Sequence, residues 1–148
     1  MNQNSTLKNL IPKPVRAVSR PGIFQLSTET SIHANHPELA GISDYLRNQL
    51  AIHIQMLFPM LEKKKAGQIR IDLEELDLGV EGYRLHVNSQ GVRVSARDGE
   101  GVFRGVQTLL QLIEQGEDGW FVPACEIEDE PRFSWRGVML DVARHFFP

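Results

Sequence analysis

Apolar side chains recur every three or four residues along two stretches of the chain, which is the spacing of one face of a helix. The first stretch begins at Pro37, a residue that suits the first turn of a helix, and runs to about Phe58. The second follows a turn at 98–101 and runs up to Gly116. The pattern predicts two amphipathic helices, with apolar faces made by Leu39, Ile42, Leu46, Leu50, Ile54 and Leu57 in the first and by Val102, Val106, Leu109, Leu110 and Ile113 in the second.

Around these helices, apolar and polar residues alternate, as in strands with one buried face. Pro21-Gly22 indicates a turn before the first of these strands, and the residues 88–91 join two others into a hairpin. We expect the last strand to carry the chain away from the domain. The predicted strands are 24–27, 31–34, 68–73, 81–87, 92–96 and 120–127.

Two amphipathic helices need one apolar sheet face to cover, and one-sided alternation is typical of antiparallel sheets. The sequence therefore predicts an α+β fold, an antiparallel-rich sheet with two helices packed on one face. We expect residues 10–128 to form this domain, preceded by a flexible, polar N-terminus at residues 1–9.

Charge and composition exclude several classes of function. The 148 residues include 16 basic and 19 acidic side chains, a net charge of −3, which gives no footprint for nucleic acid or an anionic membrane. The N-terminus has no apolar signal-peptide core, and no run of about 18 apolar residues could span a bilayer. We therefore expect a cytoplasmic protein without nucleic-acid or membrane partners. Cys125 is the single cysteine, so no internal disulfide can form.

Candidate chemistry before residue 131 is sparse. His33 and His36 have no partner cluster, so we expect no metal, and the glycines at 99, 101 and 105 do not fit a phosphate-binding loop, so we expect no cofactor. Alternation places Glu126, Glu128 and Glu130 on one side of an extended segment that faces water. Nothing nearby would hold one of these carboxyls neutral, so they make a poor acid/base pair.

The stretch from Trp135 to Val142 is apolar enough for a strand buried on both faces, as in a parallel barrel. Arg136 and Asp141 interrupt it, and a charge in such a strand must be paired or must face a ligand. The residues alone allow a structural pair of Asp141 with Arg136 or with Arg144, or a ligand contact.

Residues 131–148, PRFSWRGVMLDVARHFFP, closely resemble the start of the catalytic barrel in family 20 glycoside hydrolases, the β-N-acetylhexosaminidases. Three upstream segments, at 10–14, 81–85 and 105–112, resemble the same family in the same order. The resemblance implies an accessory domain followed, at residues 129–148, by a linker and the first strand of a truncated (β/α)8, or TIM, barrel. A whole barrel takes roughly 250 residues.

The family resemblance also implies roles for residues in the last stretch. Arg136 matches an arginine that binds hydroxyls of the terminal N-acetylhexosamine, while Asp141, Arg144 and His145 would support the strand end around it. The family's catalytic Asp-Glu pair lies on a later barrel strand, and Asp129-Glu130 precedes the first, so we expect no catalytic residue in this chain. The full-length protein would be a retaining hydrolase in which the substrate's own acetamido group attacks, acting on terminal GlcNAc or GalNAc of chitooligosaccharides or glycans.

We therefore expect the 148-residue chain to be inactive by itself and its apolar C-terminal tail to favour self-association. Two alternatives remain open. One is a stand-alone carbohydrate-binding or interaction module, and the other is the accessory domain of a related glycosidase.

Overall fold

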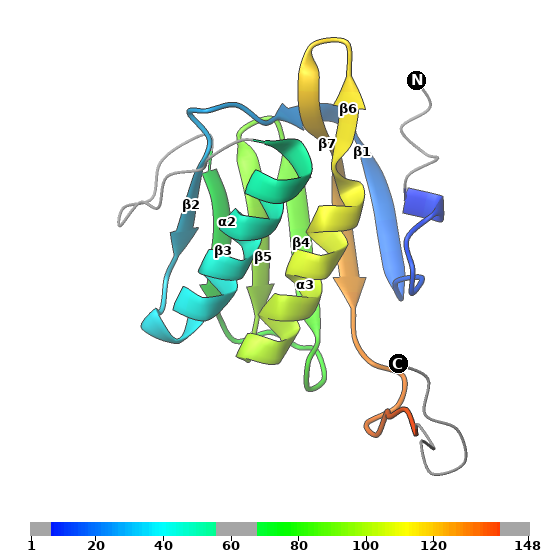
Figure 1. Cartoon of the computed structure of the whole chain (residues 1–148). Coiled ribbons are helices and arrows are strands. Elements are labelled where there is room, and N and C mark those ends of the chain that lie inside the picture. The colour runs from blue at the N-terminus through cyan, green and yellow to red at the C-terminus, as the bar shows by residue number, and fades with distance from the viewer. Residues whose placement is uncertain (1–6, 56–67, 140–148) are drawn as a thin grey trace, which may run out of the picture.

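The computed structural model describes residues 7–55 and 68–139 and shows one sheet with two helices across one of its faces (Figure 1). Along the sheet the strands follow the order β1-β7-β4-β5-β3-β2, and β6 pairs with β7. Pairing is antiparallel from β1 to β5 and parallel for β5–β3 and β3–β2, so the predicted antiparallel-rich α+β sheet is confirmed and has a parallel end. The strands are β1 (Arg16–Gln25), β2 (Ser31–Ala34), β3 (Gln68–Leu73), β4 (Tyr83–Asn88), β5 (Gly91–Ala96), β6 (Glu114–Gly116) and β7 (Gly119–Asp129).

Both predicted helices are present and cover the same face of the sheet (Figure 1). The first consists of a 3-10 turn, η1 (Pro37–Leu39), and of α2 (Ala40–Ile54), and the second is α3 (Gly99–Leu112). α2 ends where Gln55 takes a left-handed backbone conformation, with φ of 55°, and residues 56–58 of the predicted helix lie outside the described residues. None of the helices in the described ranges is both long and apolar enough to cross a bilayer.

The core lies between the helices and the sheet, and the apolar stripes predicted from the sequence form its helical side. Burying each large aliphatic side chain there contributes about 1.5–3 kcal/mol. α3 approaches the sheet closely at Gly105, where an added Cβ would lie 2.4 Å from Cγ1 of Val94. Fully or almost fully buried helical side chains include Leu39, Leu46, Leu50, Ile54, Val102, Val106, Leu109 and Leu112.

The start of the sheet corrects the prediction of a turn at Pro21-Gly22. These residues lie inside β1, which is a single strand paired with β7. The register shifts between Ser19 and Ile23, so the two residues form an irregularity in the ladder, and Gly22 has φ of 104°. Proline and glycine suit such a bulge because proline has no N–H to pair and glycine tolerates positive φ.

Two further expectations about the domain's ends are corrected. β7 does not simply lead away from the domain, because it lies between β1 and β4 and pairs with both. Residues 1–6 of the predicted flexible segment 1–9 lie outside the described residues, whereas Leu7 has its side chain buried in the core together with Leu10. Because these two apolar side chains pack on the core, the ordered domain begins before residue 10.

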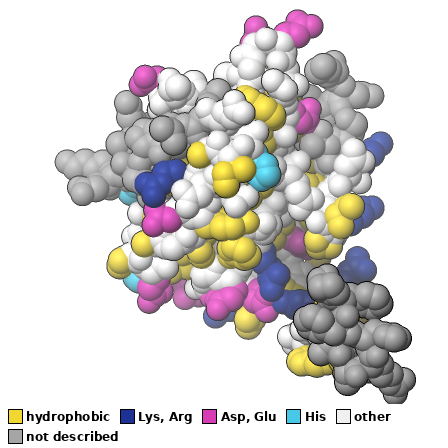
Figure 2. Space-filling model, in the orientation of Figure 1, with side chains coloured by type: hydrophobic (Ala, Val, Ile, Leu, Met, Phe, Trp, Pro, Cys, Tyr) yellow, Lys and Arg dark blue, Asp and Glu magenta, His cyan; other side chains and the backbone are white. Residues whose placement is uncertain are grey.

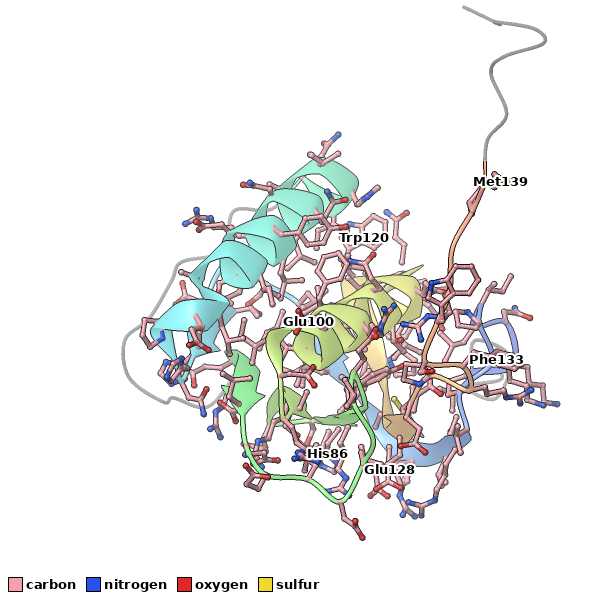
Figure 3. The ribbon with its side chains drawn as sticks, turned by 90° about the horizontal axis from the view of Figure 1, so that it is seen from below. His86, Glu100, Trp120, Glu128, Phe133 and Met139 are labelled. Carbon is pink, nitrogen blue, oxygen red and sulfur yellow. The ribbon has the colours of Figure 1, made fainter. Side chains whose placement is uncertain are left out.

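The predicted barrel strand is not confirmed. Residues 131–139 form no strand, and the remainder of the predicted strand, 140–142, lies outside the described residues. Phe133, Trp135, Val138 and Met139 are 71–97% exposed, and the segment leaves the domain beyond the end of β7 (Figure 3). An isolated apolar strand lacks both pairing partners and a surface to cover it, so its sequence alone does not make it a strand.

Candidate functional site

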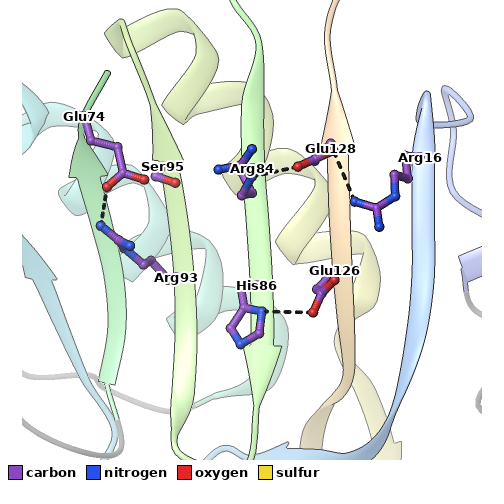
Figure 4. Close-up of a pocket in the computed structure, with 8 residues that line it drawn as sticks. All are labelled: Arg16, Glu74, Arg84, His86, Arg93, Ser95, Glu126 and Glu128. Carbon is purple, nitrogen blue, oxygen red and sulfur yellow. Dashed lines mark hydrogen bonds and ion pairs between the residues drawn. The ribbon is translucent and has the colours of Figure 1, made fainter. Parts of the chain in front are cut away.

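The face of the sheet opposite the helices carries ion pairs that cross from strand to strand (Figure 4). Glu128 on β7 accepts from Arg84 on β4 at 2.8 Å and from Arg16 on β1 at 3.3 Å. Two residues earlier on β7, Glu126 accepts from Arg20 on β1 at 2.9 Å, and its Oε1 lies 3.9 Å from Nδ1 of His86 on β4. Side chains of β1, β4, β5 and β7, together with Glu74 after β3, line a hollow of about 340 Å³.

A second charged cluster on this face is buried more deeply. The side chain of Asp72 on β3 is 1% exposed and accepts from Arg70 at 2.9 Å and from Arg93 at 2.7 Å. Arg93 also binds Glu74, the residue that follows β3. Burial of a carboxylate requires this compensation, because an unpaired charge is costly away from water.

Electrostatics keeps the glutamates of the open face ionised. The hydrogen bond from Arg20 lowers the pKa of Glu126, and the hydrogen bond from Arg84 lowers the pKa of Glu128. A general acid needs a pKa raised towards neutrality, so the two carboxylates are poorly suited to proton donation.

Two other ionisable groups of the described residues, a thiol and a phenol, also have pKa values far above neutrality. Burial raises the pKa of the Cys125 thiol to about 12, so the thiolate needed for nucleophilic attack is scarce at neutral pH. Burial likewise raises the pKa of Tyr83 to about 12, and its hydroxyl shares a hydrogen bond of 2.6 Å with Thr108. Within 7–55 and 68–139, no three His, Cys, Asp or Glu side chains come together to hold a metal ion.

Arg136, the predicted sugar-binding residue, lies on the segment that follows β7. Its Nη2 donates to Oε2 of Glu81 at 2.6 Å, and its Nη1 donates to the carbonyl oxygen of Phe133. Glu81 is also bound by Arg104 of α3. These three side chains line a hollow of about 400 Å³ together with Pro12, Lys13, Tyr83, Asp129, Glu130, Pro131, Arg132 and Phe133.

Asp141, Arg144 and His145 lie outside the described residues, so their supporting role and the proposed Asp141 pairs stay predictions. The side-chain partner of Arg136 is Glu81, for which the sequence pattern predicts no role. Arg104 and Arg136 are 23 and 55 positions from Glu81, so no periodic pattern connects the three residues. Only the fold, which brings the β3–β4 connection next to α3 and the end of β7, reveals this cluster.

Comparison with known proteins places this chain in a family. The sequence profile described as glycosyl hydrolase family 20, domain 2, matches residues 7–130. A β-hexosaminidase of Porphyromonas gingivalis is 33% identical over 148 residues, covering 93% of this chain and 19% of the relative. The chain thus spans about a fifth of that relative's length.

Solved structures give the same result. The family 20 β-N-acetylhexosaminidase of Streptomyces coelicolor superposes with a TM-score of 0.85 at 36% identity, covering 95% of this chain and 30% of that one. A mutant Streptomyces plicatus β-hexosaminidase in complex with the product GlcNAc superposes with a TM-score of 0.81 at 34% identity, with the same coverage. Because the profile match extends over most of the chain and the fold agrees, this chain belongs to glycosyl hydrolase family 20 and contains the family's domain 2.

Proposed function

We propose that this chain is the non-catalytic N-terminal part of a retaining exo-β-N-acetylhexosaminidase and that the 148-residue chain does not hydrolyse glycosides by itself. The whole enzyme would remove terminal GlcNAc or GalNAc from chitooligosaccharides or glycans. The accessory domain would brace the first strand of the catalytic barrel, which we place directly after it.

One observation carries the proposal: the profile of the family's domain 2 matches residues 7–130 of this chain. Glu126 and Glu128 are held ionised by arginines, and Glu130 accepts from the N–H of Gly79 at 2.6 Å. Retaining hydrolysis needs a carboxylic acid that stays protonated until the leaving group departs. We assign this role to the family's Asp-Glu pair on a later barrel strand, where the Glu would act as acid and the Asp would orient the attacking acetamido group.

Arg136 is the proposed sugar contact in this chain, supported by the resemblance of residues 131–148 to the family's first barrel strand. A guanidinium suits this task because it presents donors in a rigid fork that can reach two neighbouring hydroxyls. In this structure Nη2 donates to Glu81 and Nη1 to the carbonyl oxygen of Phe133, so binding a sugar would compete with both contacts.

Hydrolysis of a nitrophenyl N-acetyl-β-glucosaminide by the purified 148-residue chain tests the inactivity directly. We expect no release of nitrophenol above buffer, for the unchanged chain and for the matched Arg136→Ala variant alike. Turnover that co-purifies with the chain contradicts the proposal, and its loss in Arg136→Ala would place the activity at the C-terminal segment.

Exposed aromatic rings support a second candidate, a carbohydrate-binding module. Trp135 and Phe133 are 85% and 71% exposed, and flat aromatic faces are the surfaces on which sugar rings stack. Titration with a chitooligosaccharide, followed by tryptophan fluorescence, separates the two readings. A saturable change that is lost in Trp135→Ala but retained in Trp120→Phe favours the binding module, whereas no change favours the accessory domain.

A further inference from the structure

On the face of the sheet opposite the helices, a hollow arises because a short side chain lies among long ones (Figure 4). Ser95 on β5 lies opposite Arg84 on β4 and opposite Asp72 on β3 in the strand register. Ser95 is 2% exposed, whereas the side chains of Arg84 and Arg93 are 45% and 43% exposed. Its hydroxyl group therefore lies at the floor of the hollow, which we call the open-face hollow. The described residues that line it are Arg16, Glu74, Arg84, His86, Arg93, Ser95, Glu126 and Glu128.

The arginines of the open-face hollow have more N–H groups than their ion pairs use. A guanidinium carries five N–H donors. Among the described contacts, Arg84 uses one of them, from Nε to Glu128 at 2.8 Å. Arg93 uses two, one to Asp72 at 2.7 Å and one to Glu74. The hydroxyl of Ser95 can both donate and accept, so the hollow offers several hydrogen-bonding groups to a ligand.

Positive and negative charges balance in the lining of the open-face hollow. Three arginines and three glutamates line it, so its formal charge is zero when His86 is neutral. The arginines lower the pKa of Glu126 and of Glu128, and both carboxylates are therefore ionised acceptors at neutral pH. A charged ligand would meet like charges as well as opposite ones, which cancels most of its electrostatic attraction. The lining instead suits a neutral ligand whose groups both donate and accept hydrogen bonds.

Ion pairs fix the side chains of the hollow before a ligand binds. Glu128 accepts from Arg84 and also from Arg16 at 3.3 Å, while Arg93 is anchored to a carboxylate that is almost completely buried. Groups that are already fixed lose less conformational entropy on binding than free surface side chains do. The volume of about 340 Å³ is at the small end of the range for small-molecule sites. The hollow therefore suits a small, neutral and strongly polar molecule.

We propose that the open-face hollow binds a neutral saccharide through hydrogen bonds to Arg84, Arg93 and Ser95 and to the glutamates beside them. Saccharide hydroxyls carry no charge and both donate and accept, as this lining requires. None of the described lining residues is Trp, Tyr or Phe, so ring stacking contributes nothing, and we expect an affinity of about millimolar. The choice of saccharide rests on the proposed function: an N-acetylhexosamine chain of the kind that the whole enzyme would shorten. This site lies on the sheet and does not involve Arg136.

Titration of the nitrogen-15-labelled 148-residue chain with N,N′-diacetylchitobiose, followed through the backbone amide resonances, tests the proposal. We expect shifts at residues 84–86 and 93–95 that saturate with a single dissociation constant. Arg84→Lys keeps the charge but loses the planar fork and should weaken binding about tenfold. Ser95→Ala removes the hydroxyl at the floor and should weaken binding about fivefold. Arg97→Gln is the matched control, because Arg97 is an exposed arginine that pairs with Glu75 at 3.5 Å outside the lining.

Saturable shifts on β4 and β5 that weaken in Arg84→Lys and in Ser95→Ala, with Arg97→Gln like the parent, support the proposal, and the dispersion of each spectrum shows that the variant is folded. No shifts well above the expected dissociation constant, shifts confined to residues 133–139, or shifts caused by sodium sulfate but not by the saccharide overturn it. Hydrolysis of the nitrophenyl substrate by the chain would contradict the proposed function alone, because binding at this hollow needs no turnover. An inactive chain that does not bind the saccharide would contradict this inference alone.

Discussion

The two faces of the sheet are formed by the same strands but have opposite chemical character. On the face that meets the helices, Leu85, Val94 and Ile127 are completely buried among apolar neighbours. On the other face, the residues between them are Arg84, Arg93, Glu126 and Glu128, which pair across the strands. In Figure 2, which looks onto the helix side, apolar side chains also reach the surface between charged ones. The comparison indicates that the fold's stability comes from one face, whereas the other keeps the sheet compatible with water.

The helix-covered face should tolerate substitution least. Leu109→Ala on α3 removes a side chain with no exposed surface, and the cavity that remains should cost about 2–5 kcal/mol of the free energy of unfolding. Urea denaturation measures this loss. Ile52→Ala on α2, where the side chain is 68% exposed, is the matched control and should stay within about 0.5 kcal/mol of the parent. Equal costs at both positions would contradict the contrast between buried and exposed helix faces.

Asp72 is the exception on the charged face, because it is almost completely buried. Asp72→Asn keeps the shape but removes the charge that Arg70 and Arg93 bind, and we expect a loss of about 1.5–3 kcal/mol. The same denaturation measurement gives the value. A loss no larger than that of Glu128→Gln would mean that the buried cluster behaves like the exposed pairs.

The exposed pairs should matter least and should depend on pH. Glu128→Gln removes two ion pairs whose arginines are about half exposed, so we expect a loss below about 1 kcal/mol at neutral pH. The arginines lower the pKa of Glu128 below its unfolded value of about 4.3, so this contribution is complete above that pH and is lost as the pH falls through the folded pKa. Denaturation of parent and variant should therefore converge in acid and also in 1 M salt, where screening is strong. A gap that persists in acid would exclude the ion pairs as its cause.

The local sequence pattern was sufficient to predict helices and strands wherever one face of the element is buried against the core. The strand at 68–73 and the strand at 31–34 have the predicted limits, and Leu46, Leu50, Val106 and Leu109 lie in the core as the helical spacing predicts. The sequence did not predict the bulge in β1, because Pro21-Gly22 has the same local pattern whether the chain reverses direction or only shifts its register. Only the pairing with β7 distinguishes these cases.

The candidate site was harder to predict from the sequence, for a different reason. The apolar character of Trp135 and Val138 indicates a buried strand, but burial requires a surface, and both side chains are exposed here. The charge of Arg136 indicates a partner without identifying it, and both Asp141 and a sugar were compatible with the sequence. Glu81 lies 55 positions away and meets Arg136 only because the sheet returns the chain to the start of α3.

The hydrogen bonds at the base of β1 have a consequence for how this domain can be joined to others. Val15 donates its N–H to Asp129 at 3.0 Å, and Ile11 exchanges two hydrogen bonds with the side chain of Gln111. Entry into the sheet and exit from it therefore occur at one corner. We expect that such a unit can be inserted at a single site of a host protein, or circularly permuted, with little change to its own backbone or to that of the host.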